Sequence, residues 1–205
     1  MLKSNESYSR KCGKLIWDNA KDPVIKKSYP KGQHGPAQGV KRRSPFGKQL
    51  AEKQYVRYHF GLEEKAMFVI MKKSKQKKGD MIGNMSYFLE SRLATIIYRA
   101  NFAKSIFAAG QMVSHKKVTV NGKVINLRGY NVKIGDVVEI IHSYQTNDVL
   151  LDSIKNPKKA VPSYLVVNGE KMTISLVRNP GFKEIPFPFK GIDSNLIISY
   201  YSRRI

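Results

Sequence analysis

The sequence predicts an α+β fold in which helices come first and a small antiparallel sheet follows. Between residues 44 and 114, apolar residues recur every three or four positions, as on one face of an amphipathic helix. From residue 118 onwards, apolar and polar residues alternate between Asn-Gly pairs, which is typical of short strands joined by hairpins. We expect a basic extension over 1–43, a small helical domain over 44–84 that 191–205 completes, and a domain of two helices and a short-stranded sheet over 85–190.

The first two expected helices lie between residues 44 and 79. One extends from Ser44 to Gly61, where glycine ends it. The other opens with Glu63 and Glu64 and closes with a lysine-rich stretch over 72–78, an order that the helix dipole favours. These lysines have two interpretations, as a complement to the helix C-terminus or as contacts to a polyanion.

Two further helices are expected before the sheet. One covers residues 84–100, and Arg92 and Arg99 lie on a common side of it because they are seven positions apart. The other begins at Ser105, a natural N-cap, and ends near residue 114.

The Asn-Gly pairs at residues 121–122 and 168–169 predict two hairpins, because both residue types tolerate the positive φ of a tight turn. A further strand and turn are expected over 132–140. Residues 152–162 are rich in lysine and proline and are expected to form an exposed loop. The strands of the two hairpins are expected over 118–120, 123–125, 164–167 and 172–176.

Positive charge dominates the chain, with 37 Lys and Arg against 15 Asp and Glu and a net charge of +22. Residues 1–78 carry 20 of these bases and 6 of the acids. Between Lys26 and Gln49 there are seven bases and no acid, so ion pairing on a solvated face does not explain them. A polyanion-binding segment is favoured over a solubilising tail, because neutralising phosphates releases counterions.

Nucleic acid is favoured over a membrane as the polyanion. Membrane binding needs a basic helix with a broad apolar face, but six Gly and Pro residues from Tyr29 to Pro45 prevent a continuous helix. This segment is expected to lie as an extended strap along phosphates, with Tyr29, Gln33 and His34 available for stacking or hydrogen bonds. The longest apolar run has six residues, far fewer than the ~20 that a spanning helix needs.

No pattern of catalytic or metal-binding residues stands out. Glycine-rich phosphate-binding motifs are absent, the four histidines lack the spacing of metal ligands, and the carboxylates are sparse. Cys12 is the single cysteine; its basic surroundings can lower a thiol pKa, but no base partner is near it in the sequence. We therefore expect a non-enzyme with no metal or cofactor. The N-terminus lacks the apolar centre of a secretory signal, so an intracellular location is expected.

Five segments of the chain carry a recognisable pattern: Tyr29–Gly35, Gln49–Gln54, Leu89–Leu93, Val113–Gly122 and Tyr200–Arg203. Together they resemble the small-subunit ribosomal protein S4 family of bacteria and mitochondria. Leu89–Leu93 and Val113–Gly122 are similar to the S4 RNA-binding domain of that family. Tyr29–Gly35 and Gln49–Gln54 are similar to its basic strap and first helix, and Tyr200–Arg203 resembles its usual C-terminal end. The segments keep the family's order and extend over nearly the whole chain.

The resemblance implies a structural constituent of the small ribosomal subunit that binds small-subunit rRNA directly. It implies binding to the 5′ domain early in assembly, and a place beside ribosomal proteins three and five, where messenger RNA enters and decoding accuracy is supported. Some bacterial members also repress their own operon, a role that the resemblance leaves open. The lysine-rich composition and the style of the C-terminal end favour a mitochondrial ribosome, with the bacterial cytoplasm as the alternative. No membrane or small-molecule partner is expected.

The resemblance and the basic pattern together predict an RNA-binding surface. His115 to Lys117 would lead into the hairpin at Asn121 and Gly122, and these two residues also have a purely structural interpretation as turn formers. The predicted RNA-binding residues are Tyr29, Lys31, Gln33, His34, Lys41, Arg42, Arg43, Lys48, Gln49, Lys53, Arg57, Arg92, Arg99, Lys104, Ser105, Gln111, His115, Lys116, Lys117, Lys123 and Arg203.

Three features depart from the family pattern. Gly110 stands where members often have arginine, which removes an expected RNA contact and costs about 1 kcal/mol in a helix relative to alanine. Lys117 stands where members have a second histidine. The four-cysteine zinc knuckle that some members carry cannot form with Cys12 alone.

Two other classes of protein carry or resemble this domain. An RNA-modifying or tRNA-charging enzyme would need a further catalytic domain of ~200 residues, whereas about 55 residues follow position 150 and they suggest loop, hairpin and tail. A small factor that binds stalled ribosomal subunits would not explain the basic strap or the helices over 44–80. The ribosomal protein is therefore the favoured interpretation.

Overall fold

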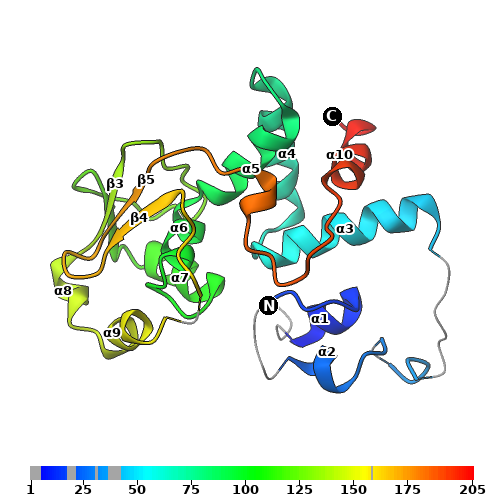
Figure 1. Ribbon diagram of the computed structural model, residues 1–205, viewed down its shortest axis with the longest axis horizontal. Helices are drawn as coiled ribbons and strands as arrows, with labels where there is room; N and C mark the ends of the chain where they lie inside the picture. The colour runs from blue at the N-terminus through cyan, green and yellow to red at the C-terminus, as the bar shows by residue number, and fades with distance from the viewer. Residues whose placement is uncertain (1–5, 18–21, 31, 37–42, 158) are drawn as a thin grey trace. The chain divides into compact units, whose positions relative to one another are not determined.

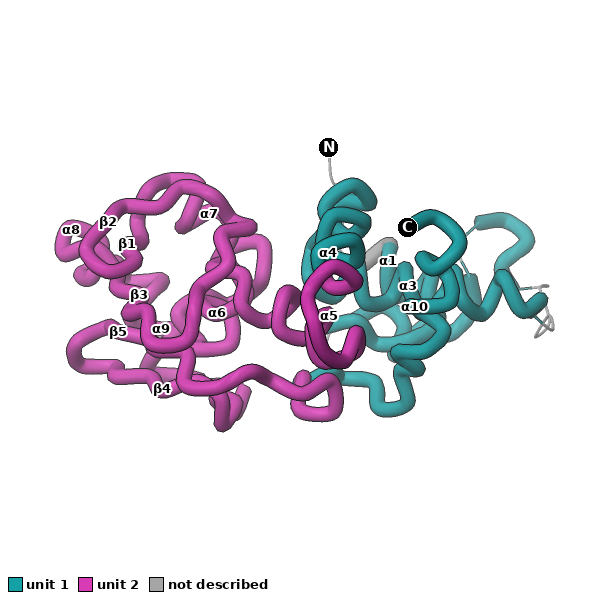
Figure 2. Tube along the Cα trace, turned by 90° about the horizontal axis from the view of Figure 1, so that it is seen from above, with its two compact units in different colours: residues 1–73, 186–205 teal, residues 74–185 magenta. Residues whose placement is uncertain are grey.

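The computed structural model describes residues 6–17, 22–30, 32–36, 43–157 and 159–205 (Figure 1). The chain forms two compact units, which Figure 2 colours separately. Unit 1 contains residues 1–73 and 186–205, and unit 2 contains residues 74–185. Three residues of the predicted RNA-binding set lie outside the described residues: Lys31, Lys41 and Arg42.

The described part of unit 1 is helical. Helix α3 (Pro45–His59) begins where the Ser44 hydroxyl accepts a hydrogen bond from Gly47 N at 3.1 Å, and proline suits the first helical position. Helix α4 (Glu64–Gln76) starts in this unit, at the place that the paired glutamates predict. The remaining helices of the unit are α1 (Glu6–Cys12), α2 (Pro23–Lys26) and α10 (Ser194–Ser202).

The core of unit 1 forms where α10, at the end of the chain, packs against α3 (Figure 1). Tyr201 of α10 and Tyr55 of α3 are buried there. The Tyr201 hydroxyl donates to Glu64 Oε1 at 3.1 Å, and Lys53 Nζ donates to Oε2 of the same carboxylate at 2.6 Å. One carboxylate therefore connects α3, α4 and α10.

Residues 32–36 of the expected strap form a turn rather than an extended segment. Gly35 N donates to the Gly32 carbonyl at 3.0 Å, and Gly32 has a φ of +101°. A Cβ on Gly35 would lie 2.0 Å from the carbonyl oxygen of Pro30, so glycine is required there. The prediction of an extended conformation is therefore wrong for these residues.

Unit 2 has two helices where the sequence predicts one over residues 84–100. Helix α5 (Met81–Glu90) ends before Ser91, and α6 (Leu93–Arg99) begins after Arg92, whose backbone is extended at φ −65° and ψ 133°. Arg92 and Arg99 therefore share no helix face, and the prediction of one continuous helix is wrong.

A loop from later in the sequence stabilises this break. Val132 N donates to the Ser91 carbonyl, and Leu93 N donates to the Tyr130 carbonyl, both at 2.8 Å. Asn131 Nδ2 donates to Ser91 Oγ at 2.9 Å. These bonds satisfy backbone groups that the end of one helix and the start of the next leave free.

The sheet of unit 2 has five antiparallel strands in the order β2-β1-β3-β5-β4, which confirms the α+β prediction. Asn121 and Gly122 have positive φ and join β1 to β2 in the predicted hairpin. Val138 and Ile140 of β3 are buried, as the alternating pattern requires. The strands are β1 (Val118–Val120), β2 (Lys123–Val124), β3 (Val137–Ile140), β4 (Leu165–Asn168) and β5 (Thr173–Leu176).

Helix α7 (Ile106–Ser114) precedes the sheet and begins at the predicted N-cap, because Ser105 Oγ accepts a hydrogen bond from Ala108 N at 3.1 Å. Two expectations further along the chain are wrong. Residues 132–134 belong to no strand of the sheet, and the expected loop over 152–162 begins inside a helix. The other elements of unit 2 are α8 (His142–Gln145), α9 (Asp148–Lys155) and the 3₁₀ helix η1 (Phe182–Glu184).

An ion pair is buried in unit 2. Arg99 Nη2 lies 2.7 Å from Glu90 Oε1, and the two side chains are 2% and 0% exposed. The Tyr164 hydroxyl donates to Glu90 Oε2 at 2.8 Å, and burial together with the Glu90 charge raises the pKa of this tyrosine above its ordinary value. The Glu90 carboxylate thus connects α5, α6 and the residue before β4.

Replacing Glu90 by alanine should lower the free energy of unfolding by about 3–5 kcal/mol, because Arg99 would keep a buried charge without its partner. Urea or thermal unfolding of the full chain measures the loss. Glu184→Ala is the matched control, since Glu184 pairs with Arg178 at the surface and should matter much less. Equal losses in the two variants would contradict a central role for the buried pair.

Replacing Tyr201 by alanine should cost about 3–5 kcal/mol of stability, because a large buried side chain is lost between α10 and α3. Tyr201→Phe should cost only about 1 kcal/mol, since it removes the hydrogen bond to Glu64 and keeps the ring. Unfolding of both variants, with the exposed Asn195→Ala as control, tests this order. A Tyr201→Ala protein as stable as the control would show that α10 does not hold unit 1 together.

Candidate nucleic-acid interface

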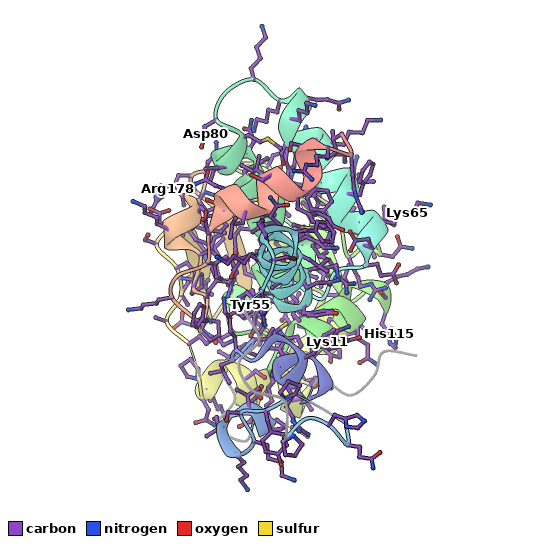
Figure 3. All side chains as sticks on the ribbon, turned by 90° about the vertical axis from the view of Figure 1, so that its right-hand side faces the viewer. Lys11, Tyr55, Lys65, Asp80, His115 and Arg178 are labelled. Atoms are coloured by element: carbon purple, nitrogen blue, oxygen red, sulfur yellow. The ribbon has the colours of Figure 1, made fainter. Side chains whose placement is uncertain are left out.

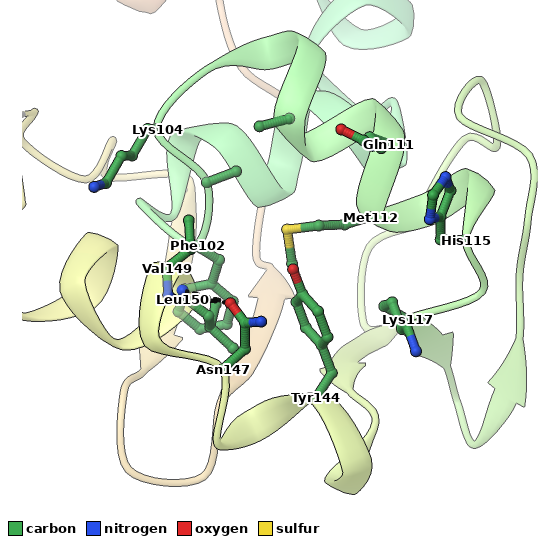
Figure 4. Close-up of a pocket in the computed structure, with 12 residues that line it drawn as sticks. Phe102, Lys104, Gln111, Met112, His115, Lys117, Tyr144, Asn147, Val149 and Leu150 are labelled. Atoms are coloured by element: carbon green, nitrogen blue, oxygen red, sulfur yellow. Dashed lines mark hydrogen bonds between the residues drawn. The ribbon is translucent and has the colours of Figure 1, made fainter.

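A pocket of about 250 Å³ lies in unit 2 between α7 and the segment that carries α8 and α9 (Figure 4). Its apolar wall includes Phe102, Met112 and Leu150, which are buried. An apolar interior with a polar, cationic rim suits an RNA base and its adjoining phosphate. Four residues predicted to bind RNA line this pocket: Lys104, Gln111, His115 and Lys117.

Helix α7 determines where the predicted residues stand. Ser105 uses its hydroxyl as the N-cap, so its role is structural and it places Lys104 just before the helix. Gln111 is exposed on the helix, and His115 is exposed at its C-cap. Lys116 has a φ of +58°, a left-handed conformation that redirects the chain from α7 towards β1.

The two lysines of the pocket rim have different partners. Lys104 forms an exposed ion pair with Asp152 of α9. Lys117 Nζ lies 5.6 Å from the centre of the Tyr144 ring, within range of a cation–π contact. In the described part of the chain, no carboxylate forms an ion pair with Lys117 or His115. The Lys117 charge is therefore left for an external anion.

Two pocket residues, Tyr144 and Asn147, are absent from the predicted set. Tyr144 is half-buried and offers an aromatic surface inside the pocket (Figure 4). Asn147 Oδ1 accepts hydrogen bonds from Val149 N and Leu150 N, so this residue also caps α9. The polar and aromatic residues over 142–147 are the sequence feature from which this side of the pocket could have been predicted.

Two predicted residues of unit 1 have internal roles. Lys53 is 2% exposed and pairs with Glu64, so the structure contradicts a direct RNA contact by its ammonium group. Arg57 Nε donates to Gln54 Oε1 at 2.8 Å, and its guanidinium lies 4.5 Å from the centre of the Tyr58 ring. Both side chains therefore stabilise the helices of unit 1.

Arg99 is a further prediction that the structure contradicts. Its guanidinium is enclosed in unit 2 and neutralised by Glu90, so it cannot reach a phosphate. Arg92 is half-buried before α6, and Lys123 is exposed on β2. Sequence spacing groups Arg92 with Arg99, but the break at Ser91 separates their environments.

Other basic and polar residues lie at the surface of unit 1, where side chains such as Lys65 extend outward (Figure 3). Tyr29 is half-buried, and the Arg10 guanidinium lies 5.1 Å from the centre of its ring. Gln49 is half-buried in α3. The predicted residues that are exposed in this unit are Gln33, His34, Arg43, Lys48 and Arg203.

The lysine-rich stretch over 72–78 has a structural role at one position at least. Asn84 Nδ2 donates to the Lys77 carbonyl at 2.8 Å and so satisfies a backbone group beyond the end of α4. Lys77 Nζ lies 4.1 Å from the centre of the Tyr87 ring. All five lysines of this stretch are exposed, which is compatible with both interpretations.

Cys12 does not have the environment of a nucleophile. Burial raises the pKa of its thiol to about 11 and outweighs the lowering by the charges of Arg43, Lys11 and Lys14, so the thiol stays protonated at neutral pH. Within the described ranges, no group of three or more His, Cys, Asp or Glu side chains could hold a metal ion. Among the helices that the structure describes, none is long and apolar enough to span a bilayer.

Two family descriptions match adjacent parts of the chain: the ribosomal protein S4/S9 N-terminal domain matches residues 2–90, and the S4 domain matches residues 91–138. The chain is 37% identical to the small ribosomal subunit protein uS4 of Ehrlichia chaffeensis over 195 residues, which cover 95% of this chain and 96% of that protein. It is 35% identical to uS4 of Orientia tsutsugamushi over 204 residues, which cover 98% of each chain. This chain therefore belongs to the uS4 family of small-subunit ribosomal proteins, as the resemblance predicts.

Proposed function

We propose that this protein binds small-subunit rRNA directly, at the 5′ domain and early in assembly, and that it catalyses no reaction. The observation that carries the proposal is the pocket rim of unit 2, where Gln111, His115 and Lys117 converge beside an aromatic ring. Its relatives are named small ribosomal subunit proteins, which supports rRNA rather than another RNA as the target.

The charge balance supports a binding mechanism based on phosphate neutralisation. With 37 bases and 15 acids, one-to-one pairing would leave 22 basic side chains without an acidic partner. Each lysine or arginine that contacts a phosphate releases condensed counterions, so affinity should fall steeply as salt rises. Hydrogen bonds to bases and 2′-hydroxyl groups at the pocket would then select among RNAs.

The finer placement within the ribosome is part of the same proposal. We place the protein beside ribosomal proteins three and five, near the point where messenger RNA enters, where it would support accurate decoding. We also place it in a bacterial ribosome rather than the mitochondrial one that the composition favours, because the uS4 proteins of Ehrlichia and Orientia that it resembles are bacterial.

The alternative is an RNA-modifying or ribosome-associated factor that carries an S4 domain. The family match over residues 2–90 counts against it, because that match describes a ribosomal protein and lies outside the S4 domain. A factor of this kind would bind its own substrate RNA in preference to the 5′ domain.

Binding to the 5′ domain of the small-subunit rRNA from the same source should survive a large excess of tRNA or random-sequence RNA. Filter binding or electrophoretic mobility shift across a salt series measures it. Selective binding to the 5′ domain would support the proposal. Equal and steeply salt-dependent binding to all three RNAs would show that the protein binds RNA only as a general polycation, and would overturn the proposal.

The double variant Lys104→Ala/Lys117→Ala should bind the 5′ domain more weakly and lower the slope of log affinity against log salt by about 1–2, because two lysines of the pocket rim are lost. Lys171→Ala/Lys183→Ala is the matched control, since it removes the same charge from exposed positions of unit 2 away from the pocket lining. Identical slopes for the two variants would exclude the pocket rim from the interface.

A further inference from the structure

Arg128 lies in the loop that stabilises the break between α5 and α6, and it is absent from the predicted RNA-binding set. Hydrogen bonds fix the loop at this residue and two residues after it. Ala94 N donates to the Arg128 carbonyl at 3.4 Å, and Leu93 N donates to the Tyr130 carbonyl at 2.8 Å. Although the Arg128 side chain is exposed, its backbone therefore has a defined position against the start of α6.

The stem of the Arg128 side chain crosses α7 at Gly110. A Cβ built on Gly110 would lie 2.8 Å from Cδ of Arg128 and 3.6 Å from its Cγ. A real Cβ at position 110 would require the stem to move, so the observed path of the Arg128 stem depends on glycine there. A glycine inside a helix is unfavourable relative to alanine, and here its lack of a side chain leaves room for the arginine stem.

The guanidinium of Arg92 lies against the same loop. A Cβ built on Gly129 would lie 3.3 Å from Nη1 of Arg92 and 3.6 Å from its Cζ, so this guanidinium sits over the residue next to Arg128. Burial lowers the pKa of Arg92 to about 10, and the positive charge of Arg128 adds to the lowering. The positive charge of Arg128 therefore acts on Arg92, and the Arg92 guanidinium is partly removed from water.

Neither arginine has a counter-charge in the described part of the chain. The ion pairs of unit 2 involve Arg99, Lys104 and Arg178 instead. An arrangement that brings two unneutralised guanidinium groups together is unfavourable in the free protein and becomes favourable when an anion binds between them. Guanidinium groups match phosphate oxygens through paired N–H donors, so phosphate is the anion that this geometry suits best.

We propose that Arg92 and Arg128, seated over Gly129 and Gly110, form a phosphate-binding site that takes the backbone phosphates of RNA. The choice of RNA as the source of the phosphate rests on the proposed function. Arg128 is the residue of this site that the sequence does not predict, because nothing in its local sequence distinguishes it from other surface arginines.

Arg128→Ala should weaken binding to the 5′ domain about tenfold and lower the salt slope by about 1, as expected for one lost phosphate contact. Arg178→Ala is the matched control, since it removes the same charge from an exposed arginine of the same unit that pairs with Glu184. Arg128→Lys should keep the slope and recover only part of the affinity, because lysine keeps the charge and loses the planar fork.

The Gly110→Ala variant distinguishes the effect of the Arg128 side chain's position from the effect of its charge alone. In the wild-type background it should weaken RNA binding severalfold, because the new methyl group displaces the Arg128 stem. In the Arg128→Ala background it should have no further effect on RNA binding, because the clash is gone. Thermal unfolding of each variant establishes that the fold is retained.

Two outcomes would overturn the inference. One is that Arg128→Ala loses no more affinity than Arg178→Ala. The other is that Gly110→Ala weakens binding equally with and without Arg128. If the proposed function is wrong, the result is different: the wild-type protein would not distinguish the 5′ domain from competitor RNA. The phosphate site would still stand in that case if Arg128→Ala binds every RNA more weakly than Arg178→Ala.

Discussion

Glu90 is the residue on which unit 2 depends most, because its carboxylate is wholly buried and has two partners from other elements. Arg99 neutralises it from α6, and the Tyr164 hydroxyl donates to it from the residue before β4. A buried carboxylate without such partners would be too costly to keep charged. The break between α5 and α6 therefore does not leave the two helices independent, since the ion pair connects them across it.

Acidic residues are scarce in this chain, and two of them, the half-exposed Glu64 and the buried Glu90, lie at junctions between elements. Glu64 connects α3, α4 and α10 through Lys53 and Tyr201, much as Glu90 connects three elements of unit 2. With 15 acids for 37 bases, an acid committed to a junction cannot also neutralise the surface. The exposed lysines and arginines that remain repel one another in the free protein, and an RNA partner would relieve that repulsion.

One loop serves both the fold and the proposed function of unit 2. Its residues 130–132 hold Ser91 and Leu93 in the break between two helices, which keeps Arg92 out of either helix. The neighbouring Arg128 uses the open space at Gly110 to cross α7. The same hydrogen bonds that shape the backbone therefore hold Arg92 and the backbone of Arg128 in the places that the proposed phosphate site requires.

Local chemistry in the sequence was enough to predict the helix start at Ser44, the cap at Ser105, the Asn121–Gly122 hairpin and the α+β class, because each depends on residues close together in the chain. Only the tertiary structure decided that Arg99 and Lys53 are buried. A basic residue has the same local pattern whether it faces RNA or a buried carboxylate, and the carboxylate here lies on another helix. The helix break and the place of Arg128 depend on contacts about forty residues apart or between separate elements, which no local spacing encodes.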